Sequence, residues 1–267
     1  GARNVDNKIL ASDFSYLPAR PETEKNVDVV YFAGCMGHLT PAVKRAMLQI
    51  FEAAGINYTF LDEDGSICCG RPLKLAGMKD AALKLVAENT SKIKRTNAKI
   101  LVTSCPICYK VFNNDYKLDG MQVMHHSVFI DKLVEDKKLT LNPLGIKTVY
   151  HDPCELGRGS GIYEQPRHVL KQISEVAGVT EERANALCCG GSIGELNMSA
   201  TQRNVIRDNA LNVLCEPNPD ILVTACPLCK KTFGPGSGTP VVDIAELVAE
   251  SMNQEKPALK SKTLVEV

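Results

Sequence analysis

Eleven cysteines occur among the 267 residues of this chain, and ten of them follow one spacing pattern twice. The pattern is a single cysteine, then an adjacent pair followed by glycine, then a C-P-x-C motif. The first cysteine set is Cys35, Cys68, Cys69, Cys105 and Cys108, and the second cysteine set is Cys154, Cys188, Cys189, Cys226 and Cys229. Thiolates are redox centres and ligands for soft metals, so both sets indicate metal or redox chemistry.

The adjacent pairs favour a centre with several metal atoms. A disulfide between neighbours is strained and links nothing distant, so it is a poor structural element. A zinc site uses four ligands, and so does a cubane iron–sulfur cluster, whereas each set offers five. Adjacent thiolates project in different directions and can contact different metals, while Gly70 and Gly190 let the backbone pass close to the inorganic core. We therefore expect these two glycines to line a cofactor site.

Two alternatives remain open from the residues alone. The CPIC and CPLC motifs each lie between an expected strand and an expected helix, which is also the position of a thioredoxin-type redox pair. Sulfur ligands do not choose between zinc and iron, so zinc in one half is a second alternative.

The flanking sequences repeat together with the cysteines. The offsets between matching cysteines lie between 119 and 121 residues, SICCGRPLKLAG is answered by ALCCGGSIGEL, and KILVTSCPICYKVF by DILVTACPLCKKTF. Such a repeat indicates an internal duplication. We expect an N-terminal arm or linker at 1–26, a first domain at 27–143 and a second at 144–267, with the boundary near the NPLG segment at 142–145.

Strands and helices alternate in both halves. Short apolar runs predict strands at 27–34, 57–62, 99–104 and 121–127, and amphipathic periodicity predicts helices at 41–55, 73–93 and 128–136. The second half predicts strands at 147–152 and 220–225 and helices at 166–178, 201–214 and 244–252. The alternation predicts an α/β fold of two pseudo-symmetric, Rossmann-like or flavodoxin-like parallel-sheet domains. In such sheets ligands bind at the carboxyl ends of the strands, where every cysteine group falls.

Several other residues lie near the cysteines in sequence. His38 and His151, each three residues from a cysteine, are candidates for contact with a substrate. The basic residues Arg71, Lys74 and Arg158 could bind an anionic substrate, although solvated surface charge explains them equally well. We expect structural roles for the three remaining candidates, Cys215, His125 and His126.

Composition excludes several functional classes. The 31 basic and 31 acidic residues cancel without forming charged blocks, so nucleic acid is not an expected partner. No apolar run is long enough for a transmembrane segment and no signal peptide is apparent, which predicts a cytoplasmic protein. The chain begins with glycine, as a trimmed chain or a piece of a longer one would. No G-x-G-x-x-G motif or ferredoxin-type cysteine run is present, so electrons are expected from another subunit.

The order C, CCG and C-P-x-C, present twice, resembles the cysteine-rich CCG domains found in heterodisulfide reductase. Similar domains occur in iron–sulfur subunits of glycolate, lactate and anaerobic glycerol-3-phosphate oxidation systems. The resemblance extends over nearly the whole chain from Val27. It implies that each cysteine set binds a noncubane [4Fe-4S] cluster, so that all ten cysteines are metal ligands and take part in catalysis through the clusters.

The resemblance also implies a reaction. A disulfide or heterodisulfide would be reduced or formed between the two clusters, with electrons supplied by flavin and iron–sulfur partner subunits, peripheral to a membrane if a partner is bound there. Because neither set has lost a cysteine, the reductase is favoured. The alternative is an electron-transfer subunit that carries electrons from an organic-acid or glycerol-3-phosphate dehydrogenase to quinone. A zinc-stabilised scaffold protein is a third hypothesis.

Overall fold

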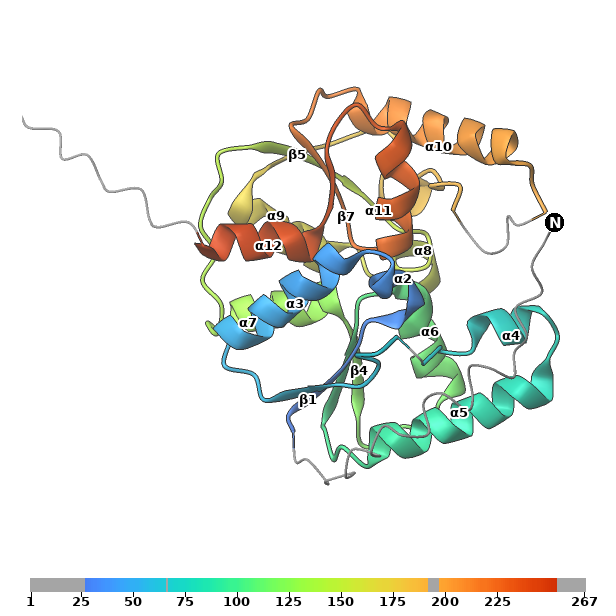
Figure 1. The fold of residues 1–267 in the computed structure, drawn as a ribbon. Coiled ribbons are helices and arrows are strands. Elements are labelled where there is room, and N and C mark those ends of the chain that lie inside the picture. The colour runs from blue at the N-terminus through green and yellow to red at the C-terminus, as the bar shows by residue number, and fades with distance from the viewer. Residues whose placement is uncertain (1–26, 66, 192–196, 254–267) are drawn as a thin grey trace, which may run out of the picture.

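Two parallel sheets of four strands form the framework of the protein. The computed structural model describes residues 27–65, 67–191 and 197–253. The strand orders are β2-β1-β3-β4 in the first sheet and β6-β5-β7-β8 in the second, and every pairing is parallel (Figure 1). The second order repeats the first with each strand number raised by four. The predicted pair of α/β units is therefore confirmed.

The first sheet is built from short apolar strands. Its members are β1 (Val29–Phe32), β2 (Tyr58–Phe60), β3 (Ile100–Thr103) and β4 (Gln122–His125). All four residues of β1 are buried, as expected for a strand covered on both faces. The helices of this half are α2 (Gly34–His38), α3 (Pro41–Ala53), α4 (Arg71–Leu75), α5 (Lys79–Lys94), α6 (Pro106–Asp115) and α7 (His126–Glu135).

The second half repeats this arrangement. Its strands are β5 (Lys147–His151), β6 (Glu175–Ala177), β7 (Ile221–Thr224) and β8 (Val241–Asp243). Its helices are α8 (Gly157–Ser160), α9 (Glu164–Ile173), α10 (Ala200–Cys215), α11 (Pro227–Phe233) and α12 (Ile244–Asn253), with short 3₁₀ turns η1 (Arg183–Asn185) and η3 (Gly234–Gly236).

Four elements differ from the sequence expectations. The helix predicted at 166–178 ends at Ile173, and the residues from Glu175 form β6 because they pair with β5. The helix predicted at 73–93 is two helices, α4 and α5, separated at Gly77, whose φ of +73° interrupts the helix. The strand predicted at 121–127 ends at His125, and β8 was not predicted at all.

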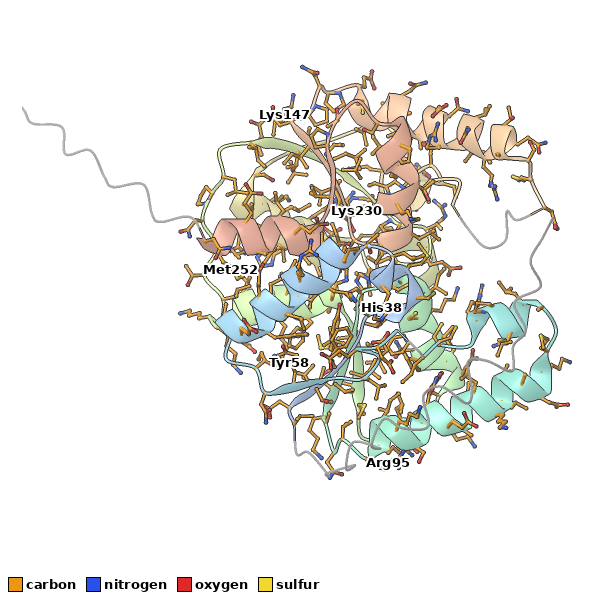
Figure 2. The ribbon with its side chains drawn as sticks, viewed as in Figure 1. His38, Tyr58, Arg95, Lys147, Lys230 and Met252 are labelled. Carbon is orange, nitrogen blue, oxygen red and sulfur yellow. The ribbon has the colours of Figure 1, made fainter. Side chains whose placement is uncertain are left out.

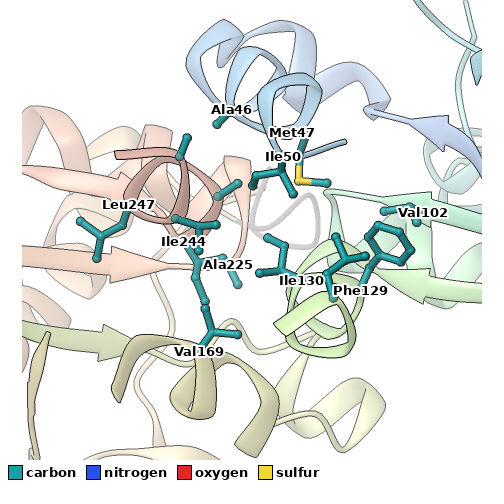
Figure 3. Close-up of a cluster of buried hydrophobic side chains, with 14 of the residues drawn as sticks. Ala46, Met47, Ile50, Val102, Phe129, Ile130, Val169, Ala225, Ile244 and Leu247 are labelled. Carbon is teal, nitrogen blue, oxygen red and sulfur yellow. The ribbon is translucent and has the colours of Figure 1, made fainter. Parts of the chain in front are cut away.

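Four helices form one hydrophobic core between the two sheets. Helix α3 packs against α12, and α7 packs against α9, so each contact joins one half of the chain to the other. Figure 3 shows that apolar side chains of all four helices meet there, including Met47, Ile130, Val169 and Ile244. Helices α5 and α10 lie on the outer faces of the first and second sheets (Figure 1). The two halves are therefore joined by a common interior.

The segment at 142–145, where we expected the boundary, is hydrogen-bonded into the second half. The Asn142 amide donates to Ser251 Oγ at 2.8 Å, and the Leu144 amide donates to the Ile173 carbonyl at 2.8 Å.

Of the helices in the described part of the chain, none is both long enough and apolar enough to cross a membrane.

Candidate functional site

Both cysteine sets lie where the strands of their sheet end. Cys35 is in α2 directly after β1, and the C-P-x-C motifs begin α6 and α11 directly after β3 and β7. The adjacent pairs lie in the loops that follow β2 and β6. Parallel strands end at the same edge of a sheet, so positions far apart in sequence come together.

The first cysteine set lines a single cavity. All five of its cysteines border a space of about 350 Å³, which we call the first cavity. Cys35 is exposed and Cys68 is partly exposed, whereas Cys69, Cys105 and Cys108 are buried. The predicted convergence of these five residues is what the structure displays.

The second cysteine set also converges, around a much smaller space. Its five cysteines line a cavity of about 20 Å³, which we call the second cavity, and the Sγ atoms of Cys189 and Cys229 are 3.3 Å apart. Ile107 and Leu228, the variable residues of the two C-P-x-C motifs, line both cavities. The two sets are thus neighbours, with these two apolar side chains between them.

The local backbone suits anionic sulfur. Pro106 and Pro227 begin α6 and α11, and the preceding cysteines occupy the N-cap positions, where the positive end of a helix dipole favours negative charge. In the adjacent pairs, the Gly70 amide donates to Cys68 Sγ at 3.5 Å, and the Gly190 amide lies 3.4 Å from Cys188 Sγ. Both glycines have positive φ angles, +98° and +79°, so a side chain there would strain the turn.

Hydrogen bonds among the thiols redistribute their charge in the first set. Donation from Cys108 and Cys68 lowers the pKa of Cys69 to about 3, and donation from Cys108 also lowers the pKa of Cys105. The donors keep their protons: the hydrogen bond to Cys69 and burial raise the pKa of Cys68, and the hydrogen bonds to Cys105 and Cys69 raise that of Cys108. Burial raises the pKa of Cys35. Hydrogen bonding therefore favours the ionised form at Cys69 and Cys105, the two buried acceptors.

In the second set, hydrogen bonds raise the pKa values of three thiols. A hydrogen bond with Cys188 raises the pKa of Cys189 to about 12, and another with Cys188 raises that of Cys154. Hydrogen bonds with Cys189 and Cys226 raise the pKa of Cys229. Ionising several of these crowded thiols together requires a compensating positive charge.

Asp62 fixes the turn that precedes Cys35. This fully buried carboxylate accepts hydrogen bonds from the amides of Ala33 at 2.9 Å and Gly34 at 2.8 Å. His38 Nε2 lies 3.2 Å from the same carboxylate, and His38 Nδ1 lies 2.9 Å from Lys44 Nζ. His38, labelled in Figure 2, does not line the first cavity. Sequence reasoning missed Asp62, although its place just after β2 was a signal.

Two neutral side chains hold the Cys68–Cys69 turn. Asn89 of α5, which is buried, donates to the Cys68 carbonyl at 2.9 Å and to Tyr116 Oη at 2.9 Å. Tyr116 Oη in turn donates to the Cys69 carbonyl at 3.1 Å. Neither residue was predicted, because neither lies near a cysteine in the sequence.

Replacing Asn89 with leucine should destabilise this turn. A buried carbonyl that loses its donor costs about 1–3 kcal/mol, so the free energy of unfolding should fall by about that amount. Thermal unfolding measures the effect. Asn113→Leu is the matched control, because Asn113 is exposed and donates to the Tyr109 carbonyl in its own helix. Equal effects of the two substitutions would contradict the assignment.

His151 and Arg158 support the corresponding loop in the second half. His151 is buried, its Nε2 lies 3.2 Å from the Leu187 carbonyl, and burial lowers its pKa to about 4. Arg158 Nη1 donates to the carbonyls of Ala184 at 3.0 Å and Ala186 at 2.6 Å. Both side chains are therefore engaged with the backbone that leads to Cys188, and neither lines the first cavity.

The remaining predicted basic residues separate into two environments. Arg71 lines the first cavity, and its guanidinium is 3.6 Å from Glu155 of the second half, which Lys110 also approaches at 3.1 Å. Lys74 does not line it and pairs with Asp115 at 2.6 Å. Sequence reasoning missed three cavity-lining residues of α10, which are Arg203, Asn204 and Arg207.

The unmatched cysteine and the two adjacent histidines lie apart from the two cavities. Cys215 ends α10 and is partly exposed, with its Sγ 3.9 Å from Thr239 Oγ1. His125 and His126 are fully buried, and His126 Nε2 is 2.9 Å from Asp243 Oδ1 of the other half.

The chain is similar in sequence to several known proteins. An EtfAB:quinone oxidoreductase of Syntrophomonas wolfei is 30% identical over 253 residues, which cover 87% of this chain and 35% of that protein. One subunit of the dihydromethanophenazine:CoB–CoM heterodisulfide reductase of Methanosarcina barkeri is 31% identical over 255 residues, or 89% of this chain and 62% of that protein. An uncharacterised iron–sulfur protein of Methanocaldococcus jannaschii is 30% identical, over 83% of this chain and 43% of that protein. The chain thus spans less than two thirds of each of these relatives.

Solved structures offer weaker matches. A crystal structure of a putative Asp/Glu racemase from Yersinia pestis covers 84% of this chain and 97% of its own, with 13% identity and a TM-score of 0.38. The cysteine-rich domain family named CCG matches residues 29–113 and again residues 148–234, which include both complete cysteine sets. With two such repeats over more than half of its length, the chain belongs to the cysteine-rich CCG domain family.

Proposed function

We propose that this chain is an iron–sulfur subunit of an oxidoreductase and that each cysteine set binds one [4Fe-4S] cluster of noncubane type. The observation that carries the proposal is the convergence of five cysteines around each of two neighbouring cavities. A cubane cluster or a zinc ion would leave one thiol of each set unused. The names of the relatives support the same assignment, because they include iron–sulfur and heterodisulfide reductase proteins.

The residues of both sites fit such a group. Thiolates are the form in which cysteine binds metal, and metal binding displaces their protons. Cys69 and Cys105 already have lowered pKa values, and the amides of Gly70 and Gly190 point toward sulfur in both adjacent pairs. The crowded thiols of the second set would lose their raised pKa values beside cationic iron. The donor chemistry therefore matches iron–sulfur ligation in both halves.

We propose disulfide reduction, or its reverse, as the reaction. A disulfide takes up two electrons and two protons to give two thiols, and the bound clusters would supply those electrons one at a time from flavin and iron–sulfur partner subunits. The chain itself would position the substrate in the first cavity and exclude water with Ile107 and Leu228. Proximity of the sulfur to a fixed reaction centre lowers the barrier without further contacts.

A second candidate function has one specific observation in its favour. The relative named EtfAB:quinone oxidoreductase matches 87% of this chain at 30% identity. On that alternative the two clusters would only carry electrons between a dehydrogenase and quinone. The two functions differ in whether a disulfide is a substrate.

Protein purified without oxygen should contain about eight iron and about eight acid-labile sulfide atoms per chain, as two four-iron clusters require. Reduced viologen should then be oxidised when a disulfide is added. Colourless protein with zinc instead of iron would contradict the assignment and favour a scaffold role. Iron-loaded protein that fails to reduce any disulfide, yet reduces a quinone when supplied with its partner, would favour electron transfer.

A further inference from the structure

Three side chains of the kinds that bind metals meet where the two halves pack together, outside both cavities. Asp131 and Glu135 belong to α7 of the first half, and His168 belongs to α9 of the second half, the helix on which α7 packs. One carboxylate oxygen of each acid and one ring nitrogen of the histidine lie within 4.8 Å of one another. None of the three lines either cavity, so this group, which we call the interhelix cluster, is separate from the cysteine sets.

The histidine ring is oriented toward the acidic face of α7. Asp131 and Glu135 are one helical turn apart and therefore lie on the same face of that helix. His168 Nδ1 is 2.5 Å from Asp131 Oδ1, and the other ring nitrogen, Nε2, is 3.5 Å from Gln172 Nε2. With the Gln172 amide turned over, its oxygen accepts the Nε2 proton and leaves the Nδ1 lone pair directed at the carboxylates. Metal-binding histidines are commonly held by such a second partner.

The negative charge of the interhelix cluster is only partly balanced. In the described part of the chain no lysine or arginine pairs with Asp131 or Glu135, and the nearby Lys132 pairs with Asp136 at 2.9 Å instead. Like charges one turn apart on a helix repel, and Asp131 is only 6% exposed, so water screens it poorly. His168 supplies at most one positive charge against two negative ones. A divalent cation would match them.

The duplication provides an internal comparison for this interface. The buried positions of α7 recur in α12 with a constant offset of 118 residues, which places Ala249 where α7 has Asp131 and Asn253 where it has Glu135. Helix α12 packs on α3 as α7 packs on α9. The equivalent interface is therefore made without either carboxylate, so helix packing alone does not require the two acids.

The donor atoms suit a divalent transition metal. Imidazole favours zinc and related ions, carboxylate favours manganese and magnesium, and the cluster contains no sulfur. Bonds from such ions to nitrogen and oxygen are about 2.0–2.2 Å long, which separates neighbouring donor atoms by roughly 3–3.5 Å. Glu135 is exposed and the His168 side chain is 50% exposed, so both can shift by the small distance needed, and an ion can enter from solvent.

We propose that Asp131, Glu135 and His168 form a binding site for one divalent transition-metal ion. The two carboxylates come from the first half and the imidazole from the second, so the ion ties α7 to α9 across the interface. The site contains no cysteine and does not depend on the iron–sulfur assignment.

A titration with Mn²⁺ tests the site. This ion prefers oxygen and nitrogen ligands to thiolates, and the room-temperature electron paramagnetic resonance signal of its free form is lost on binding. Protein purified without oxygen and dialysed against a chelator should bind about one Mn²⁺ per chain at the cluster. A small excess of Zn²⁺ should release it and restore the signal, whereas the same excess of Mg²⁺ should not, because imidazole favours zinc.

Asp131→Ala and His168→Gln should each weaken Mn²⁺ binding by at least about tenfold, since each removes a ligand. The alanine is the residue that the second repeat has at the equivalent position, so α7 should still pack. Asp136→Asn is the matched control, because it removes the same charge next to the end of α7 and should leave the affinity unchanged. Far-ultraviolet circular dichroism equal to that of the wild type shows that the variants are folded.

The opposite results would overturn the proposal. Wild-type protein that leaves the Mn²⁺ signal unchanged would show that the three side chains form only a hydrogen-bonded group. Folded Asp131→Ala and His168→Gln proteins that bind Mn²⁺ as tightly as the wild type would refute the assigned ligands. Release by Mg²⁺ as readily as by Zn²⁺ would show attraction to surface acids without a histidine ligand. None of these results depends on the iron content, which tests the proposed function separately.

Discussion

Serine in place of Cys69 should lower the iron content from about eight to about four atoms per chain, because one of two four-iron clusters would lose a buried ligand. Cys69 accepts hydrogen bonds from two neighbouring thiols and is buried at the centre of the first set. A serine hydroxyl ionises far less readily than a thiol and is a harder ligand, so it does not replace the thiolate. Iron and acid-labile sulfide assays on protein purified without oxygen measure the result.

The duplicated sequence supplies its own controls for this experiment. Cys189→Ser, the equivalent change in the second set, should also leave about four iron atoms. Cys215→Ser should leave the iron content unchanged, because Cys215 lies at the end of α10 outside both sets. Circular dichroism shows whether each variant is folded. Folded Cys69→Ser and Cys189→Ser proteins that both retain the full iron content would refute the ligand assignment.

Truncating Ile130 to alanine should lower the free energy of unfolding by about 2–5 kcal/mol, because the side chain is completely buried and the surrounding helices can close the cavity only in part. Ile130 belongs to α7, and its core is shared by helices of both halves (Figure 3). We therefore expect both halves to unfold together. Urea unfolding followed by circular dichroism and by tyrosine fluorescence, to which tyrosines of both halves contribute, measures this.

A matched surface substitution completes that test. Leu83→Ala removes the same class of side chain from α5, where Leu83 is 68% exposed, and should change the free energy of unfolding by no more than about 0.5 kcal/mol. Two separate transitions in the wild type, one for each half, would contradict a shared core. Similar losses for the two substitutions would contradict the burial argument for Ile130.

The architecture and the grouping of the cysteines could be predicted because both depend on local patterns and one topological rule. Apolar runs such as Val29–Phe32 identify buried strands, and parallel strands deliver the following residues to one edge. The spacing of Cys35 and Cys105 therefore implied proximity without any knowledge of distances. Because the sequence is duplicated, the same spacing implied that the cysteines of the second set also lie close together.

What escaped prediction depends on contacts between distant segments. The apolar periodicity of α9 continues past Ile173, and only pairing with β5 converts Glu175–Ala177 into a strand. Arg158 lies close to Cys154 in sequence yet donates to backbone carbonyls, whereas Arg203 is far from the first set in sequence and lines its cavity. The direction of each side chain and the packing between the two halves decide where Arg158 and Arg203 lie. The spacing of residues in the sequence predicts neither of these.

The helix pairs between the sheets have an evolutionary consequence. Because α3 packs on α12 and α7 on α9, a polypeptide with only one repeat would expose the apolar faces of two helices to water. Two identical copies would cover those faces mutually, since the repeats are related by approximate twofold symmetry. The duplication thus implies a half-length ancestor that worked as a homodimer, with gene fusion later freeing each copy to diverge. The difference in cavity volume, about 350 Å³ in one repeat and about 20 Å³ in the other, is consistent with that divergence.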